Sequence, residues 1–371
     1  MNQRGGGILP KQTKSVWLRI TGHLLILRDA NWQEVTGPPG DGWLVPFGKL
    51  TPTRTGMNVQ SEPTGSGLRA LYDLVVAAGG QLVDGALQLP PGVGTGYIQL
   101  LAPEPDLRLA VHHCSLRQPL TLKRSADATQ PEQLLISFNA FDPAPGHGVG
   151  YLPSVQISSS DIGFTSNLPA HTPLVIVALS IHKSRLRRWL NPADEPLPAI
   201  LTTRQPVVSD TLLTPDIQRI VADFAQPHAR PYLPNFYYRI RIQELLYWLL
   251  VELANRTAPS RLLHTDDVEK VYQVRSRLLT SLNTPPRLNG LAHAVGLGEA
   301  KLKPLFRQIF GTSPFAYYQS ARMAEAKRLL GHRSVSEVGY QLGFTNLSHF
   351  ARLFEKHYGI TPKKYQATLH G

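Results

Sequence analysis

The C-terminal third of this chain contains the same short pattern twice, and this duplication constrains the fold more than any other feature. The first copy spans 288–317 and the second spans 335–365. The copies are offset by 47 residues as far as Gly296 and Gly343, and by 48 residues beyond them. The second copy therefore carries one additional residue after its glycine. Two copies in register predict two structurally equivalent units.

Each copy is expected to form a helix, a tight turn and a second helix. Apolar residues recur with the 3.6-residue period of an α-helix on both sides of each glycine. Gly296 and Gly343 stand where a helix must end and turn, which glycine permits because it tolerates positive φ. Gly298 and Asn346 are the predicted N-caps of the second helices. Such helix-turn-helix units with a basic outer face are typical of proteins that read the major groove of DNA.

The residues of the second copy carry a family resemblance. They read Gly-Phe-Thr-Asn-Leu-Ser-His-Phe at 343–350 and Gly-Ile-Thr-Pro-Lys-Lys-Tyr at 359–365, which is similar to the signature of the AraC/XylS family of bacterial transcription regulators. The first copy and the joining helix at 322–330 match as well, and the resemblance covers about 266–369. It implies a helical domain that binds double-stranded DNA and acts with RNA polymerase, without a catalytic residue, cofactor or metal.

A narrower resemblance concerns the first copy. Lys-Leu-Lys at 301–303 and Phe-Gly-Thr-Ser-Pro-Phe at 310–315 are similar to the pyochelin-regulator branch of the family, which responds to a ferric siderophore. This implies a small-molecule effector, with a ferric siderophore as the specific expectation. The sequence does not single out effector-binding residues.

Basic residues are concentrated in the same region. Of a formal net charge of +12, residues 266–371 contribute +8, from 15 Lys and Arg against 7 Asp and Glu. Such a field attracts a polyanion, and nucleic acid is the usual one. A solvated basic face is the alternative, and the duplicated motif favours DNA.

The preceding residues predict a second domain of a different class. Residues 83–181 contain short stretches rich in β-branched and apolar residues, separated by Pro and Gly. This pattern favours a β-sandwich or a jelly-roll barrel without distinguishing them, and the family resemblance implies a cupin-like sensor.

The expected fold is α+β and multidomain, with an uncertain extension at 1–66, a β-rich sensor domain at 67–256, a linker at 257–265 and a DNA-binding domain at 266–371. We interpret residues 1–56 as a misassigned extension and Met57 as the true start.

A long helix is expected at 236–256. Its apolar stripe includes Tyr237, Ile240, Trp248 and Leu249. Two interpretations remain open: the stripe packs against the β-rich domain, or it forms the interface of a homodimer, as in other members of the family.

Helical phase selects the side chains that would reach DNA. With Phe306 and Phe350 turned inward, the exposed positions of the two second helices become the base-reading candidates, and these are Ala300, Lys301, Lys303, Pro304, Ser348, His349 and Arg352. Arg352 is the strongest, because a guanidinium can bond both acceptors on a guanine edge. Pro304 departs from a good reading helix, since an interior proline costs about 3 kcal/mol or kinks the helix. The first unit is therefore expected to add phosphate affinity more than sequence preference.

A second set of residues is expected at the phosphate backbone. It combines cations with the helix N-termini at two hydroxyl-Pro dipeptides. The set comprises Arg307, Ser313, Arg322, Lys327, Arg328, Lys356, Thr361, Lys363 and Lys364. The joining helix at 314–330 would span roughly 25 Å, which suits two recognition helices one turn of duplex apart.

Two other functions fit parts of the sequence. Some DNA alkylation-repair enzymes carry the same DNA-binding module, but they need an activated cysteine, and the only cysteine, Cys114, lies in an apolar strand. A regulator without a ligand, whose β-rich domain serves only dimerisation, is the other alternative. His112 and His113 are adjacent in the same expected strand and point to opposite faces, so no metal site is predicted.

Composition and the pattern of apolar residues also predict where in the cell the protein is found. A single cysteine suits a reducing environment, the N-terminus shows no apolar leader, and the most apolar runs, at 173–181 and 244–254, are too short to cross a bilayer. We therefore expect a cytoplasmic protein that does not contact membranes.

Overall fold

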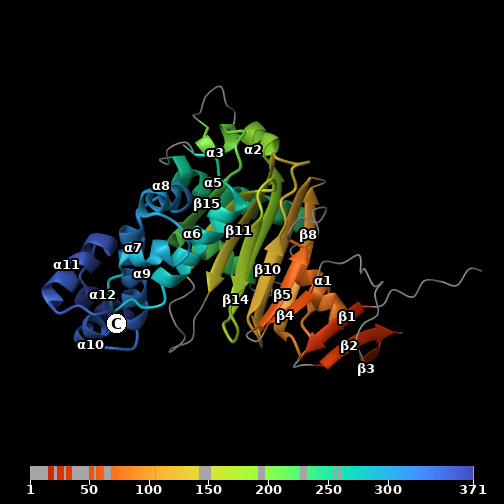
Figure 1. The fold of residues 1–371 in the computed structure, drawn as a ribbon, viewed down its shortest axis with the longest axis horizontal. Coiled ribbons are helices and arrows are strands. Elements are labelled where there is room, and N and C mark those ends of the chain that lie inside the picture. Colours follow the sequence, from red (N-terminus) through yellow and green to blue (C-terminus); the bar gives the residue numbers. More distant parts are fainter. Residues whose placement is uncertain are drawn as a thin grey trace, which may run out of the picture.

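The computed structural model divides the chain into an N-terminal antiparallel β-domain and a C-terminal helical domain (Figure 1). It describes residues 16–20, 23–28, 31–35, 50–53, 56–61, 68–104, 106–141, 152–190, 197–225, 232–254, 256 and 261–370, with the backbone alone before residue 68 and at residues 141 and 370. The expected α+β class is confirmed. The cupin-like or jelly-roll form, the domain limits and the start at Met57 stay predictions.

The β-domain is built on an eight-stranded antiparallel sheet with the strand order β15-β12-β11-β14-β9-β8-β7-β6. A second sheet has the order β13-β10-β5-β4, in which β5 runs parallel to β10, and β1-β2-β3 form a third. The strands are β1 (Val16–Ile20), β2 (His23–Arg28), β3 (Asn31–Val35), β4 (Leu50–Thr53), β5 (Gly56–Ser61), β6 (Gln81–Val83), β7 (Ala86–Gln88), β8 (Gly94–Glu104), β9 (Leu107–Leu116), β10 (Leu120–Arg124), β11 (Gln133–Phe141), β12 (Ser154–Ser159), β13 (Phe164–Leu168), β14 (Leu174–His182) and β15 (Val208–Leu212).

Alternation along β9 shows how the layers are arranged. Leu107 and Leu109 lie in one apolar cluster with residues of α4 and α5, whereas Cys114 and Leu116 on the opposite face pack with Leu120 of β10 and with α1. Successive side chains of a strand point to opposite faces, so α4 and α5 cover one face of the large sheet, and the second sheet together with α1 covers the other. The helices of this domain are α1 (Ala70–Ala77), α2 (Lys183–Trp189), α3 (Ala199–Thr202), α4 (Pro215–Ala225) and α5 (Pro234–Ala254).

Several strands of the β-domain are not predicted by the sequence pattern, among them β6, β13 and β15. The most consequential is β15, because it forms the edge of the large sheet that faces the helical domain. It carries Ser209, Asp210 and Thr211, all of which are buried. A buried strand with three polar residues lacks the apolar alternation by which strands are found in a sequence.

The C-terminal domain is entirely helical. Its apolar core, which includes Phe306 and Phe350, continues into the β-domain through Ile162, Phe164 and Val208. The helix α8 packs against β15, and α6 packs against β13. The helices are α6 (Thr265–Leu278), α7 (Leu288–His293), α8 (Glu299–Phe310), α9 (Pro314–Leu329), α10 (Val335–Gln341), α11 (Leu347–Tyr358) and α12 (Pro362–His370).

No helix in the ranges given above combines the length and the apolar character needed to cross a bilayer.

Candidate nucleic-acid interface

Two equivalent helix-turn-helix units lie in the C-terminal domain, α7 with α8 and α10 with α11. Gly296 and Gly343 follow the first helix of each unit with φ values of 68° and 76°, in the left-handed region that favours glycine. Asn346 is the N-cap of α11, and its side-chain oxygen accepts a hydrogen bond from the backbone N–H of His349 at 3.1 Å. Gly298 occupies the same position before α8 without a side-chain cap.

Aromatic rings fix the rotation of both second helices. The fully buried Phe306 of α8 meets Tyr317 of α9 with 5.6 Å between ring centroids. The equivalent Phe354 of α11 meets Tyr365 of α12 at 5.8 Å. Because each helix buries this side, its opposite side faces solvent.

The helix α11 presents a mixed set of hydrogen-bonding side chains to solvent. Ser348, His349, Arg352 and Lys356 are all exposed. The His349 ring lies edge-on to Phe344, with 5.9 Å between centroids, which orients the imidazole. Ser348 and Arg352 are four residues apart and therefore on the same side of the helix. This surface therefore carries a guanidinium, a hydroxyl and an imidazole on one exposed part of the helix.

The helix α8 is less suited to reading bases. Ala300 and Arg307 are exposed, but Lys301 Nζ is ion-paired with Asp267 Oδ1 at 2.7 Å. Lys303 Nζ is paired with Glu299 Oε1 at 2.5 Å. Two cations of this face are thus already partnered by carboxylates.

Pro304 lies inside α8 and is half-buried. The helix nevertheless continues without interruption from Glu299 to Phe310. The proline removes one backbone donor without ending the helix, and its ring offers no hydrogen bond to a base.

Several phosphate candidates lie at the start of helices. Ser313 is the N-cap of α9, and its hydroxyl accepts a hydrogen bond from the N–H of Ala316 at 3.2 Å. The hydroxyl of Thr361 accepts one from the N–H of Lys364 at 3.4 Å. Lys363 and Lys364 are exposed in the first turn of α12.

Arg322 is engaged within the protein. It is only 4% exposed, its Nη2 donates to the carbonyl of Leu342 at 2.6 Å, and its guanidinium lies 3.9 Å from the centroid of the Phe344 ring. Burial lowers the pKa of this group from its ordinary value. Arg322 therefore joins α9 to the turn of the second unit, and its contact with a phosphate stays a prediction.

Two neighbouring cations of α9 are also engaged within the protein. Lys327 Nζ lies over the rings of Tyr358 and Tyr365, at 5.2 and 5.7 Å from their centroids. Arg328 forms a half-buried ion pair with Glu325 at 2.6 Å. Both side chains help to hold α9 in place, and phosphate contact by either remains a prediction.

Two further exposed cations lie beside the helix-turn-helix units and are not among the residues predicted from the sequence to contact DNA. Arg287 is the N-cap residue of α7, and Arg333 immediately precedes Ser334, the N-cap of α10. The side chain of Arg333 donates to Gln341 Oε1 at 2.7 Å. The sequence could have indicated both arginines as candidates for DNA contact, because each lies just before the first helix of a unit.

Cys114 of the β-domain is not an activated nucleophile. Cys114 is buried, and burial raises the pKa of its thiol to about 12, so the reactive thiolate is disfavoured. His112 is buried on the same face, and burial lowers its pKa to about 4. No group of three or more His, Cys, Asp or Glu side chains suited to a metal ion occurs in the described part of the chain.

Comparison with known proteins identifies the helical domain. Residues 291–368 match the family model of the helix-turn-helix domain. The regulatory protein PchR of Pseudomonas aeruginosa is 42% identical over 64 residues, which are 17% of this chain and 22% of that protein. The transcriptional activator VirF of Yersinia enterocolitica is 25% identical over 175 residues, covering 47% of this chain and 61% of that protein. The chain thus spans between about a fifth and three fifths of the length of these two relatives.

A solved structure of an AraC-type transcriptional regulator from Chromobacterium violaceum is 29% identical in sequence and has a TM-score of 0.26, covering 28% of this chain and 93% of that one. Each of the relatives named here is described as a regulator. The duplicated units and the matched family model show that residues 291–368 form a helix-turn-helix domain, and this domain is similar to parts of the regulators PchR and VirF.

Proposed function

We propose that this protein is a sequence-specific transcription regulator that binds double-stranded DNA and reads its bases chiefly through α11. The observation that carries the proposal is the exposed side of α11, where Ser348, His349 and Arg352 stand together on a helix with an N-cap and a buried aromatic core. A helix that follows a glycine turn and exposes such donors has the form that enters a major groove. Arg352 is assigned the guanine-reading role.

The first unit contributes differently in this proposal. Lys301 and Lys303 are paired with carboxylates, and Ala300 and Pro304 have no hydrogen-bonding side chain. Ala300 can contact a thymine methyl group, and Arg307 can approach a phosphate. The helix α8 therefore supplies affinity and a second point of contact more than base preference.

The separation of the two units supports simultaneous contact with one face of a duplex. The 16 residues of α9 span roughly 24 Å at 1.5 Å per residue. The packed helices at its two ends extend this distance toward the roughly 34 Å between successive major grooves. Bending of the duplex would accommodate the remainder.

The β-domain is assigned a sensory role, in which a small molecule favours one arrangement of the two domains over another. A ferric siderophore is the specific effector we propose, on the resemblance of 301–303 and 310–315 to the pyochelin-regulator branch and on the local identity with PchR. RNA polymerase and a second copy of this chain are the protein partners proposed with it.

The experiment that tests the function is genome-wide enrichment of DNA bound to the full-length tagged protein, with and without iron starvation and in parallel with Arg352→Ala. The proposal expects discrete enriched sites that share a sequence motif and are lost in the variant. Sites upstream of siderophore or outer-membrane receptor genes that change with iron would support the narrow effector. Absence of any shared motif in the wild-type sample would contradict DNA-sequence recognition.

A further inference from the structure

The β-domain holds the two helix-turn-helix units unequally. The first unit is docked on it, because α8 packs against β15, and the preceding helix α6 packs against β13. The main contacts of α10 and α11 are instead with α9, α12 and each other. In Figure 1 the second unit accordingly lies at the end of the molecule farthest from β8 and α1.

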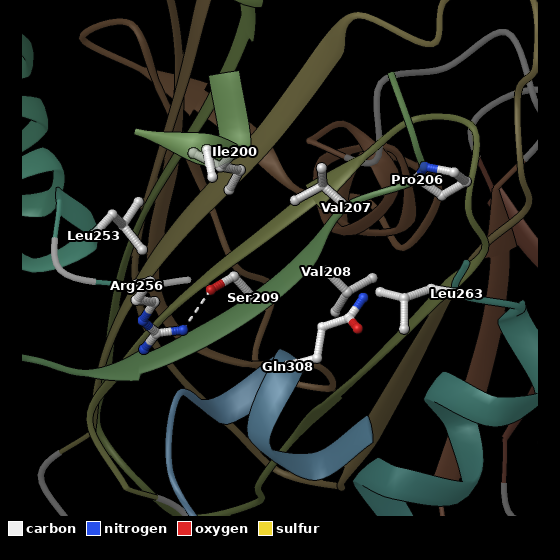
Figure 2. Close-up of a pocket in the computed structure, with 10 residues that line it drawn as sticks. Ile200, Pro206, Val207, Val208, Ser209, Leu253, Arg256, Leu263 and Gln308 are labelled. Carbon is white, nitrogen blue, oxygen red and sulfur yellow. Dashed lines mark hydrogen bonds between the residues drawn. The ribbon is translucent and has the colours of Figure 1, made fainter. Parts of the chain in front are cut away.

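One side chain crosses this interface with several hydrogen bonds. Arg256 follows the end of α5, and its guanidinium donates to Ser209 Oγ at 2.6 Å, to the carbonyl of Asp210 at 3.0 Å and to the carbonyl of Ile309 at 3.4 Å. Figure 2 shows Arg256 beside Ser209 and Leu253, on the side of β15 that faces α8. We call Arg256 and its acceptors on Ser209, Asp210 and Ile309 the Arg256 clamp.

The end of α8 is shaped around this arginine. Gly311 follows α8 with a φ of 71°, and a Cβ built on it would lie 2.8 Å from Arg256 Cζ. The equivalent Gly359 after α11 has a φ of 72°, yet nothing lies within 4 Å of such a Cβ. Both helices therefore end in the same backbone conformation, and only the first receives a cation from the β-domain side. A cation at a helix C-terminus also interacts favourably with the helix dipole.

A second polar contact reinforces the clamp. Gln308 Nε2 donates to the carbonyl of Arg261 at 2.8 Å, and Gln308 Oε1 accepts from the N–H of Arg261 at 3.1 Å. Gln308 and Arg256 both line a cavity of about 40 Å³ between β15 and α8. The hydrogen bonds of both side chains give this interface directional contacts.

A buried carboxylate of β15 has one of its hydrogen-bond partners in the helical domain. Asp210 is fully buried, and its Oδ2 accepts from the hydroxyl of Tyr272 of α6 at 3.2 Å and from Gln156 Nε2 of β12 at 3.3 Å. A buried donor or acceptor that loses its partner destabilises the folded state. Strand β15 therefore cannot shift relative to α6 and α8 without breaking specific bonds.

We infer that Arg256 is a coupling residue, which transmits a displacement of β15 or of the C-terminal end of α5 to α8 while leaving α11 free. The reader side of α8 stays exposed in this arrangement, as at Ala300 and Lys303. The clamp therefore acts on the position of the first unit and does not cover its surface. As a route of DNA control this inference rests on the proposed function, whereas the mechanical coupling itself does not.

The coupling can be tested by hydrogen exchange on the full-length protein, comparing wild type with Arg256→Met and with the matched control Arg204→Met at an exposed arginine just before β15. In Arg256→Met we expect exchange to rise about tenfold at 208–212 and at 309–311 and to stay unchanged in α11, because the variant removes the hydrogen bonds that Arg256 donates to both segments. The control should match wild type. Unchanged exchange at both segments in Arg256→Met would overturn the coupling.

A second arm adds DNA. Coupling is reciprocal, so a duplex selected in vitro with the wild-type protein should alter exchange at 208–212 in wild type and not in Arg256→Met, while protection of α11 is kept in both. Persistence of the β15 response in the variant would overturn the inference. If no duplex is selected, the proposed function fails, and the DNA-free arm still decides the coupling. Should Arg256→Met not fold, Arg256→Lys, which keeps the charge and loses the fork of donors, should show the same pattern more weakly.

Discussion

The two helix-turn-helix units share a backbone plan and differ in what surrounds it. Both turn at a glycine with positive φ, and both bury an equivalent phenylalanine, Phe306 or Phe354. In the first unit, however, cations pair with carboxylates and the helix end is bound by Arg256. In the second, the side of α11 that carries Ser348, His349 and Arg352 is exposed, and Asn346 caps the N-terminus of the helix. Duplication supplied two copies of one fold, and side-chain differences fit one copy to the β-domain and the other to solvent.

The largest expected effects come from the two equivalent buried rings. Phe306→Ala and Phe354→Ala should each lower the free energy of unfolding by about 3–5 kcal/mol, because each removes a fully buried aromatic side chain. Chemical denaturation measures this loss. Hydrogen exchange separates the units: exchange in β15 should rise with Phe306→Ala only. An equal rise in both variants would show that the second unit is docked as firmly as the first.

Replacing the turn glycines should destabilise the second unit more than the first. Gly343→Ala should cost about 3 kcal/mol, because the positive φ is strained for alanine and the new Cβ would lie 1.9 Å from the carbonyl oxygen of Asn283. Gly296→Ala should cost about 1 kcal/mol, since only the φ penalty applies and nothing lies within 4 Å. Thermal unfolding of the two variants measures the difference. Equal losses would mean that the second turn is not packed against Asn283.

DNA affinity should depend more on α11 than on α8. Arg352→Ala is expected to weaken binding to a selected duplex by about 1–3 kcal/mol and to relax the preference at one base pair. Fluorescence anisotropy with the selected duplex and with single-base variants measures both effects. If Arg352→Ala weakened selected and random duplexes equally, Arg352 would be a phosphate contact.

The smallest effects on DNA affinity should come from exposed lysines, and these also compare the second unit with the first. Lys363→Ala should weaken all duplexes alike by less than about 1 kcal/mol and reduce the salt slope of binding by about one unit. Lys303→Ala should change affinity by no more than about 0.5 kcal/mol, because this lysine is paired with Glu299 on an exposed helix face. Salt titrations of both variants give the comparison. A larger loss for Lys303→Ala would place α8 at the DNA backbone in its own right.

The sequence predicted most of the helical domain because its signals are local. Gly343 predicts the turn and Asn346 predicts the N-cap of α11, and the two residues are only three positions apart. The helical spacing of Phe350 and Phe354 predicts which side of α11 is buried. The sequence did not predict that Arg322 is buried, because the partner that holds this side chain, the carbonyl of Leu342, is 20 residues away. Helical phase alone does not say which neighbouring element covers a side chain.

The interface between the domains was not predictable for the same physical reason. Strand β15 is held by Arg256, Tyr272 and Gln156, which come from three separate parts of the chain. Burial raises the pKa of Asp210 above its ordinary value, and nearby arginines oppose this rise. Such a polar strand is stable only with those partners in place, and nothing in its five residues indicates them.

The most direct test of the account is in vitro selection of duplexes from a random pool with the full-length wild type, with Arg352→Ala and with Ala300→Gly. The account predicts one shared motif for wild type, the loss of a guanine position from that motif with Arg352→Ala, and an essentially intact motif with Ala300→Gly. A motif that is unchanged in Arg352→Ala and altered in Ala300→Gly would contradict the assignment of base reading to the second unit.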